Sequence, residues 1–466
     1  MQTTTNNRFD DLAIKGRVVY PTDSDWDVAH QAFSTIVDQR PEAMVFPADA
    51  DDVVTIVNYA REHGVRIAPQ ATAHNAGPLG ELDETIVVQT SDMADFSIDP
   101  IAHRVRVGSG IKWEKITPDL SNQGLAGLHG SSPDVGIAGY SLGGGMGWLA
   151  RKYGLQTNSV TAIELVTAEG QFRRVTSENE PDLFWALRGG GGNFGIVTAI
   201  EFAVYPVEEL YAGAMFFPFE RAAEVLHTWR ELLPTFPDEL MTWANILHFP
   251  PLPEVPEPFR GASYVIVMGA YLGEEREGRG LLRRVRDLGA EIDTFAMVPP
   301  IELGELAMDP PDPLPFVSGH EMLGELSEEL MDELLEIVGP ESGSGTTVTL
   351  FNLRHMGGAL ARKSPGAGAR ATLPGEVSLF ALGVAPDDEA IQAVQGRINR
   401  LVAAAQPHRV GQYPNFVEEP ADASTFFDAA TWARLRAMKA AYDPQDLFKG
   451  NHYIPPAEAR AIELAA

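Results

Sequence analysis

Short apolar runs alternate with polar turns over the first 207 residues and predict strands interleaved with helices. Residues 43–46 and 65–68 form apolar runs, and the acidic stretch 49–52 caps a helix between them, so a β–α–β unit is expected. The turn 168–170 indicates a hairpin. Further strands are expected at 85–89, 104–107, 162–167, 171–175 and 196–204, and a helix at 113–122.

The pattern changes after residue 207, where amphipathic helices alternate with strands and the proline-rich loops 250–253 and 310–313 separate them. An alternation of this kind predicts an α+β layer, in which helices cover one face of a sheet. One expected strand ends at 218, and the others lie at 264–269, 346–353 and 377–383. The expected helices lie at 222–233, 276–288, 327–338 and 387–404.

The first 39 residues predict a helical lead-in. Asp23-Ser24-Asp25 offers N-cap side chains, and Trp26, Ala29, Ala32 and Phe33 recur at helical spacing. The first ten residues carry no apolar core of a signal peptide, and no stretch reaches about 18 uninterrupted apolar residues. We therefore expect neither a signal peptide nor a membrane span, and the cytoplasm is the default compartment.

Composition narrows the classes of partner. A chain of 466 residues is too long for one compact core, so two or three domains are expected. Its 65 acidic and 35 basic residues give a formal charge of -30, which argues against a nucleic-acid or anionic-membrane partner. The charge implies a soluble, self-repelling surface, and it equally fits life in salt; the sequence leaves both interpretations open. The absence of cysteine excludes disulfides, thiolate nucleophiles and cysteine-ligated metals.

Two stretches of small residues suggest that the backbone closes on a ligand. In 66–78, small residues surround His74, and little side chain blocks backbone N–H groups from an anion. In 130–148, seven glycines in nineteen residues argue against a stable helix or a well-packed strand. The alternatives are a hydrogen-bonding loop histidine and a glycine-rich turn between core elements.

Two formal motif matches lack the structural context that they need. Gly190, Gly192 and Gly195 match G-x-G-x-x-G, but a predicted helix precedes them and a strand follows, which is the reverse of the dinucleotide fingerprint. Ser141 stands in a G-x-S-x-G match, but a loop precedes it and three glycines follow Leu142. An NAD site and a serine nucleophile are therefore both disfavoured.

The eleven histidines show no metal-ligand spacing, so no metal site is expected. His320 and His355, the latter beside Arg354, lie in the middle of the chain. These side chains are candidates for a substrate pocket. A lone histidine is more often a satisfied surface or core residue, and that alternative stays open for both.

The glycine-rich loops, together with 411–416 and 442–456, resemble in this order the FAD-binding oxidoreductases of the vanillyl-alcohol-oxidase fold, in the berberine-bridge-enzyme-like branch. The similarity covers about residues 10–208 and 409–456. It implies an α+β fold with a two-lobed PCMH-type FAD-binding domain and a substrate domain whose antiparallel sheet is covered by helices. The implied parts are a lead-in at 1–39, the FAD domain at 40–207, the substrate domain at 208–408 and a segment at 409–466 that returns to the FAD domain.

The resemblance also implies how the cofactor is held. The family's Arg-Ser-Gly-Gly-His reads Gln70-Ala71-Thr72-Ala73-His74 here, so His74 would be joined covalently to the flavin 8α-methyl and the backbone of 70–75 would hold the pyrophosphate. Ser132 replaces the cysteine that forms a second covalent bond in many relatives, so a single link is expected; non-covalent FAD is the alternative. The implied FAD-binding residues are His74, Gln70, Ala71, Thr72, Ala73, Asn75, Ser132, Val135, Gly136, Gly139, Tyr140, Gly143, Gly144, Gly147, Gly195, Ile196, Val197 and Asn451.

Catalytic residues follow from the same resemblance. Tyr413-Pro414-Asn415-Phe416 matches the family's Tyr-x-Asn-Tyr/Phe, so Tyr413 would take the proton of a substrate hydroxyl, with Asn415 beside it. Arg354 or His355 is a candidate for lowering the pKa of this phenol. Val135 would border the flavin, where a small residue is associated with access of oxygen. We expect an oxidase that takes hydride from an alcohol carbon of a sugar or secondary metabolite and reduces O2 to H2O2; an amine donor and a dehydrogenase remain alternatives.

Overall fold

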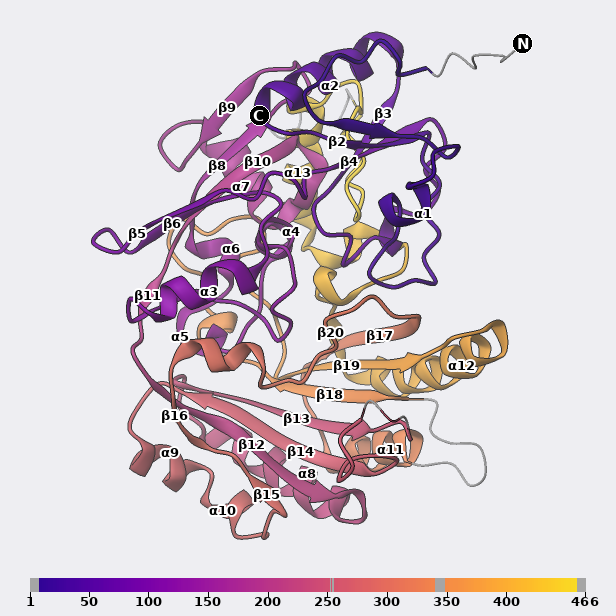
Figure 1. The fold of residues 1–466 in the computed structure, drawn as a ribbon. Helices are drawn as coiled ribbons and strands as arrows, with labels where there is room; N and C mark the ends of the chain where they lie inside the picture. Colours follow the sequence, from indigo (N-terminus) through magenta and orange to yellow (C-terminus); the bar gives the residue numbers. More distant parts are fainter. Residues whose placement is uncertain (1–7, 252, 254, 340–347, 459–466) are drawn as a thin grey trace.

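The computed structural model describes residues 8–251, 253, 255–339 and 348–458, which form an upper part of two sheets above one large sheet (Figure 1). The first upper sheet has the order β1-β2-β4-β3 and consists of β1 (Arg17–Val19), β2 (Ala43–Phe46), β3 (Arg66–Gln70) and β4 (Thr85–Gln89). Strands β2 and β3 both run parallel to β4, which lies between them. The predicted β–α–β unit is therefore confirmed, with a third strand inserted.

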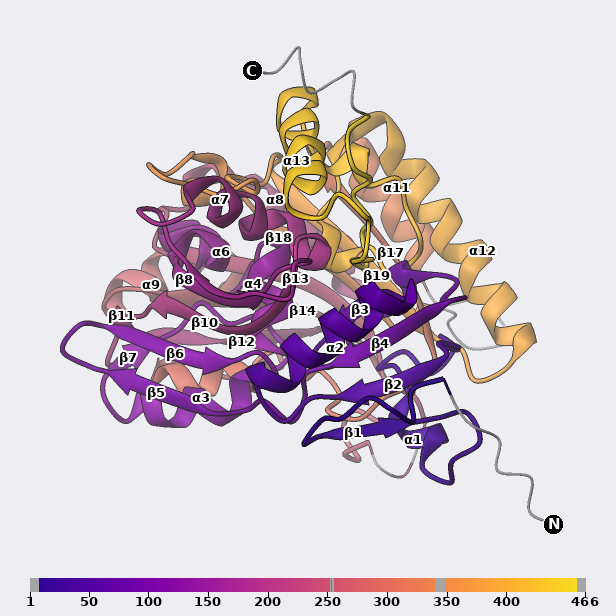
Figure 2. The same cartoon turned by 90° about the horizontal axis from the view of Figure 1, so that it is seen from above.

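Helix α2 (Ala50–His63) begins and ends where the sequence predicts. The Asp49 carboxylate accepts hydrogen bonds from the N–H groups of Asp51 and Asp52, and Gly64 ends the helix with a φ of 64°. Residues Val53, Ile56, Val57 and Ala60 are buried against the sheet. Seen from above, α2 runs alongside β3 and β4 of the first sheet (Figure 2).

The second upper sheet is antiparallel and has the order β5-β6-β10-β8-β9. A two-stranded ribbon of β7 (Leu125–Ala126) and β11 (Tyr205–Pro206) follows at its edge. The sheet strands are β5 (Phe96–Asp99), β6 (Arg104–Gly108), β8 (Val160–Val166), β9 (Phe172–Val175) and β10 (Ile196–Ala203). The helices of this part are α3 (Trp113–Ser121), α4 (Ile137–Gly143), α5 (Ala150–Tyr153), α6 (Gln156–Ser159) and α7 (Pro181–Gly190).

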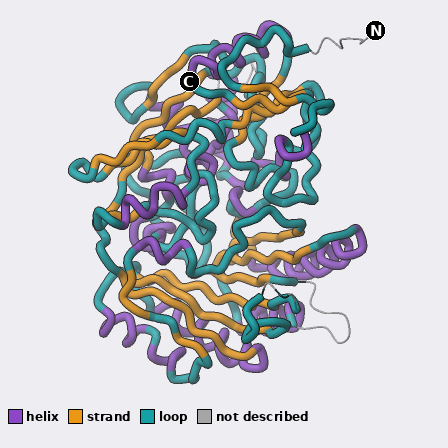
Figure 3. Tube along the Cα trace, in the orientation of Figure 1, coloured by secondary structure: helices purple, strands orange, loops and turns teal. Residues whose placement is uncertain are grey.

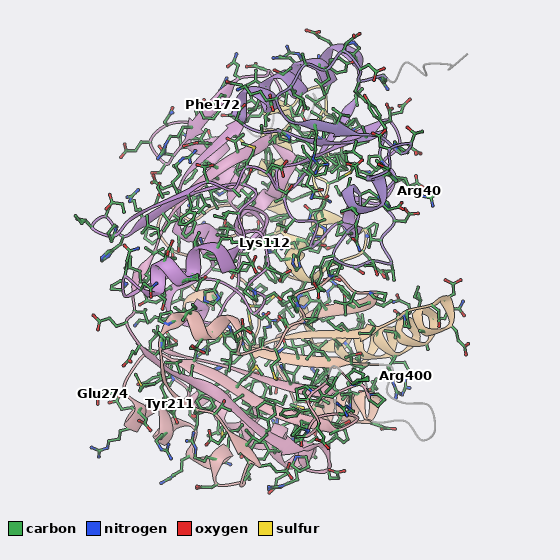
Figure 4. The ribbon with its side chains drawn as sticks, viewed as in Figure 1. Arg40, Lys112, Phe172, Tyr211, Glu274 and Arg400 are labelled. Atoms are coloured by element: carbon green, nitrogen blue, oxygen red, sulfur yellow. The ribbon has the colours of Figure 1, made fainter. Side chains whose placement is uncertain are left out.

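The large sheet is antiparallel and has helices on one face, as predicted. Tyr211, labelled in Figure 4, lies in the core between the sheet and those helices and is fully buried. The helices are α8 (Ala222–Leu232), α9 (Glu275–Leu281), α10 (Arg283–Arg286), α11 (Glu328–Val338) and α12 (Asp388–Ala405). The strands are β12 (Leu210–Pro218), β13 (Leu240–His248), β14 (Ser263–Tyr271), β15 (Ile292–Asp293), β16 (Ala296–Val298), β17 (Phe316–Leu323), β18 (Leu350–His355), β19 (Val377–Val384) and β20 (Arg409–Gly411).

The chain enters the large sheet at Leu210 and leaves it at Gly411, after which it returns to the upper part (Figure 1). Helix α13 (Ala429–Tyr442) then packs against α7. The expected domain boundaries at 39, 207 and 408 stay predictions that agree with this path. Residues 346 and 347 of the expected strand 346–353 lie outside the described residues.

Three expectations about local structure were wrong. Within the described part of the lead-in, only α1 (Trp26–Ala29) is helical, because Phe33 donates its N–H to Ala73 O at 3.1 Å and stacks on His74 instead. The glycine-rich stretch 130–148 contains a helix, α4. The expected helix 276–288 is two short helices that meet at Leu282.

Lys439 holds the returning segment in place. It has no exposed side-chain surface and donates to Asp443 Oδ2 at 2.6 Å, Phe448 O at 2.6 Å and Asn193 O at 2.9 Å. Lys439→Met is expected to lower the free energy of unfolding by about 3–5 kcal/mol, because Asp443 is left buried without its cation. Chemical unfolding monitored by far-UV circular dichroism measures this change.

A matched control is Lys152→Met, which removes an exposed ion pair with Glu239. Exposed ion pairs contribute little, so this variant should unfold close to the wild type. Equal stability of the two variants would show that Lys439 does not hold the segment.

Candidate active site

A cavity of about 630 Å³ lies between the upper part and the sheet face opposite α8, α11 and α12. Loops and short helices fill this middle layer (Figure 3). The upper wall comes from residues within 69–75, 130–143 and 189–197, and the side wall from 413–418 and 451–454. These three loops of mostly small residues and the C-terminal motifs therefore meet around one space, as the sequence predicted.

Most of the predicted site residues border this cavity. Gly144, Gly147, His320 and His355 do not line it. The predicted residues that do line it are Gln70, Ala71, Thr72, Ala73, His74, Asn75, Ser132, Val135, Gly136, Gly139, Tyr140, Gly143, Gly195, Ile196, Val197, Arg354, Tyr413, Asn415 and Asn451.

His74 is fixed on two sides. Its Nε2 lies 2.7 Å from Asp134 Oδ2, and its ring stacks on Phe33 with centroids 3.9 Å apart. An ionised carboxylate only accepts hydrogen bonds, so Nε2 carries the proton and Nδ1 keeps a free lone pair. Sequence reasoning missed Asp134, although it stands inside the motif 130–136 and an acidic residue in a ligand-binding loop was a usable signal.

Glycine is required where α4 meets neighbouring loops, which explains a helix of this composition. A Cβ on Gly143 would lie 1.8 Å from Asn415 Oδ1, and a Cβ on Gly136 would lie 2.9 Å from the Thr72 side chain. Ile137 and Leu142 of the same helix pack into the core. The glycines therefore let α4 touch two loops of the cavity at once.

The Tyr413 hydroxyl oxygen accepts three hydrogen bonds. The donors are the N–H groups of Gly145 at 2.8 Å and Met146 at 3.1 Å, and Asn415 Nδ2 at 2.8 Å. Burial raises the pKa of Tyr413 to about 12, while the two backbone donors and the guanidinium groups of Arg354 and Arg370 act in the opposite direction. Three donors at one oxygen stabilise a phenolate more than a phenol.

His320 supports this tyrosine from behind. His320 Nε2 accepts the Tyr413 N–H at 2.9 Å, and Nδ1 donates to Leu379 O at 2.7 Å. Burial lowers the pKa of His320 to about 3, so the ring is neutral. The structure therefore assigns His320 a backbone-positioning contact, in place of the expected pocket lining.

Arg354 and His355 point to opposite faces of β18, because successive side chains of a strand alternate. The Arg354 guanidinium lies 3.9 Å from the centre of the Trp243 ring and lines the cavity. His355 Nε2 contacts Arg151 at 2.9 Å away from the cavity, and burial lowers its pKa to about 3. Of Arg354 and His355, only Arg354 is therefore placed to act on a substrate or on Tyr413.

The cavity fits a large ligand with both flat and polar parts. Four buried polar atoms of its lining residues have no hydrogen-bond partner among the described residues: Gln70 Oε1, Asn75 Oδ1, Ser109 Oγ and His452 Nδ1. A Cβ on Gly139 would meet nothing within 4 Å, because the backbone there faces open space. Unsatisfied buried groups of this kind call for a ligand, and a flavin dinucleotide offers both its ring system and its polar chain.

Other classes of site find no support. Ser141 is fully buried and donates its Oγ–H to Ile137 O at 2.7 Å within α4, so it is not a presented nucleophile. Within the described residues, no three histidine, cysteine, aspartate or glutamate side chains gather in a way that suits a metal ion. No helix in the same residues has the length and apolar character needed to cross a membrane.

Comparisons with known proteins agree with this geometry. Residues 41–176 match the FAD binding domain family. (R)-6-hydroxynicotine oxidase of Paenarthrobacter nicotinovorans is 28% identical over 464 residues, which span 96% of this chain and 98% of that protein. Xylooligosaccharide oxidase of Thermothelomyces thermophilus is 24% identical, with 93% and 91% covered.

A solved structure of similar fold is BBE-like 1 of Physcomitrella patens, with a TM-score of 0.82 at 22% identity, covering 95% of this chain and 98% of that one. The chain therefore carries an FAD binding domain, has the fold of berberine-bridge-enzyme-like structures, and is an FAD-dependent oxidoreductase like its relatives.

Proposed function

We propose that this enzyme is an oxidase that removes hydride from an alcohol carbon of a small molecule, with Tyr413 as the base. The observation that carries the proposal is Tyr413, which lines the cavity and whose hydroxyl oxygen accepts three hydrogen bonds. Bound FAD supplies the redox chemistry, since it accepts hydride from the substrate and passes two electrons to O2, which gives H2O2.

Tyr413 takes the proton of the substrate hydroxyl as the carbon loses hydride. The N–H groups of Gly145 and Met146 and the amide of Asn415 stabilise the charge on the phenol oxygen before proton transfer. The Arg354 cation adds a favourable field and is held rigid by the aromatic rings of Trp243 and Phe416. These groups lie on three separate elements, so the site is assembled by the fold.

The backbone of the three loops 69–75, 130–143 and 189–197 would hold FAD, and His74 Nδ1 is the nitrogen that would carry a covalent bond to it. The hydrogen bond from Nε2 to Asp134 supports this assignment, because it leaves Nδ1 as the nucleophilic nitrogen. Ser132 cannot form a thioether and instead donates to Asp309 Oδ2 at 2.7 Å, so one covalent link is expected. Val135 and Asn451 line the cavity and keep their proposed places beside the ring system.

Asp134→Ala is expected to slow covalent attachment at least about tenfold, because the His74 ring loses the partner that fixes its tautomer and orientation. The measurement is the growth of acid-stable flavin fluorescence after adding FAD to apoprotein. Asp134→Asn is the matched variant; it keeps an acceptor without the charge and should attach FAD at an intermediate rate. Wild-type rates in both variants would remove Asp134 from the process.

The direct test of the function is a donor screen with the purified yellow protein. We expect aerobic turnover of a hydroxylated donor with one H2O2 per donor oxidised, and bleaching of the flavin by the same donor without oxygen. Bleaching without aerobic peroxide would indicate a dehydrogenase, and turnover of amines alone would indicate an amine oxidase. The cytoplasm remains the proposed compartment, and a cysteine-free chain is compatible with it.

A further inference from the structure

The sheet side of the cavity is mainly apolar; the polar residues that line it besides Glu418 are His248, Asp309, Thr349 and Arg354. The register places Leu247, Leu350 and Leu382 in one row across β13, β18 and β19. This row ends on β17 at Ser318, which pairs with Leu382. The other apolar residues that line this side are Phe249, Pro250, Val255, Met308, Leu314, Phe316, Phe380, Val384 and Phe416.

Glu418 interrupts this apolar surface. It lines the cavity, and its Oε2 accepts a hydrogen bond from Ser318 Oγ at 3.0 Å. Its backbone lies close to Gly77, where an added Cβ would come within 2.0 Å of Glu418 O. Across the described residues, no arginine, lysine or histidine forms an ion pair with this carboxyl group, in contrast to Glu321, which pairs with Arg409 at 3.1 Å.

Burial raises the pKa of Glu418 to about 8; the hydrogen bond from Ser318 lowers it, and the nearby Glu419 raises it further. Near neutral pH the empty cavity therefore holds a largely neutral carboxylic acid. A carboxyl group in an apolar wall costs free energy that an aliphatic side chain would avoid. Such a group in a cleft indicates recognition of a ligand rather than a packing role.

Glu418 and Arg354 mark two separate poles of the cavity. Leu350 and Arg354 stand four residues apart on the same face of β18, which is roughly 13 Å along a strand. Ser318 belongs to the Leu350 row, whereas Arg354 faces Trp243 in another row. A ligand that spans both poles therefore passes Asn352, which lies between them on the same face of β18 and accepts a hydrogen bond from Arg354 Nε at 2.7 Å. Beside it the ligand meets the apolar side chains of the Leu350 row.

We propose that Glu418 binds the protonated amine of an otherwise apolar alcohol substrate, whose hydroxyl-bearing carbon lies at Tyr413. This deepens the proposed function and rests on it for the hydroxyl end. A cation supplies the counter-charge that the Glu418 carboxyl group lacks, and a charge-assisted hydrogen bond is strongest in such surroundings. The apolar row offers few partners for the many hydroxyl groups of an oligosaccharide.

The test compares binding of 3-phenylpropylamine and 3-phenylpropanol to the FAD-loaded enzyme by calorimetry and by perturbation of the flavin spectrum. Wild type should prefer the amine. Glu418→Gln, which resembles the neutral acid in shape, should weaken amine binding about 10–100-fold and alcohol binding less than about threefold, as expected for loss of a charged partner. Glu333→Gln, an exposed change on α11, is the matched control and should leave both affinities unchanged.

A second measurement needs no variant. The amine enters as a cation and ionises Glu418, so about one proton per site should be released at pH 7, seen as a dependence of the binding heat on the buffer. No preference for the amine in wild type, or equal losses for both probes in Glu418→Gln, would overturn the proposal. Because these are binding readouts, they hold even if no donor reduces the flavin, which would count against the oxidase function alone.

Discussion

Replacing Tyr413 by phenylalanine is expected to lower kcat by about 10²–10⁴-fold while FAD content stays at the wild-type level. The variant removes only the hydroxyl that accepts hydrogen bonds from Gly145, Met146 and Asn415. The ring continues to pack against Phe416, so the cavity keeps its shape. The loss should appear in the rate of flavin reduction under anaerobic stopped-flow conditions, and KM should change little.

The pH profile separates a base from a mere packing residue. Burial raises the pKa of Tyr413 to about 12, so the phenolate is the minor form at neutral pH and its fraction grows about tenfold per pH unit below that value. Wild-type kcat/KM should therefore increase with pH through the range in which the protein is stable. Tyr413→Phe should lose this increase.

Tyr205→Phe is the matched control, since Tyr205 bonds to Ser159 at 2.8 Å and does not line the cavity. It should keep both the rate and the pH profile of the wild type. Retention of the pH-dependent rate by the Tyr413 variant would move the base to another residue.

Local sequence signals predicted those elements whose residues satisfy one another nearby. Helix α2 was predictable because Asp49 caps it and its own apolar residues face one sheet. Helix α4 was not, because its glycines serve contacts with Thr72 and Asn415, which lie far away in the sequence. Phe33 fits a helical pattern, yet its contacts with Ala73 and His74 override it.

The site residues also divide into those that a local pattern predicts and those that depend on distant contacts. His74 and Tyr413 stand in motifs of recognisable order, so a linear pattern was enough to select them. The role of Asp134 depends on its contact with His74, 60 residues away, and that of Glu418 on its hydrogen bond from Ser318, 100 residues away. The histidines were the hardest to interpret, since His320 became a support for Tyr413.

The second large effect concerns the tether of the cofactor. His74→Ala is expected to abolish acid-stable flavin completely, because Ser132 offers no second point of attachment. FAD should still bind without a covalent bond, since the backbone walls of the cavity do not depend on this side chain. Acid precipitation should give a colourless pellet and a yellow supernatant, and the mass of the intact denatured protein should lack the FAD increment.

Turnover of the His74→Ala variant should fall as well, because a histidyl bond to the flavin raises its reduction potential and makes hydride acceptance more favourable. The matched control is His63→Ala, which also removes a histidine but lies on α2, away from the cavity. His63 Nδ1 contacts Tyr59 O at 2.9 Å, and its ring stacks on Tyr59. That variant should keep a yellow acid pellet. Acid-stable flavin in the His74 variant would place the covalent bond on another side chain. If the wild-type protein releases all its flavin in acid, the His74–Asp134 pair is a non-covalent binding contact. That result would leave the proposed chemistry of Tyr413 unchanged.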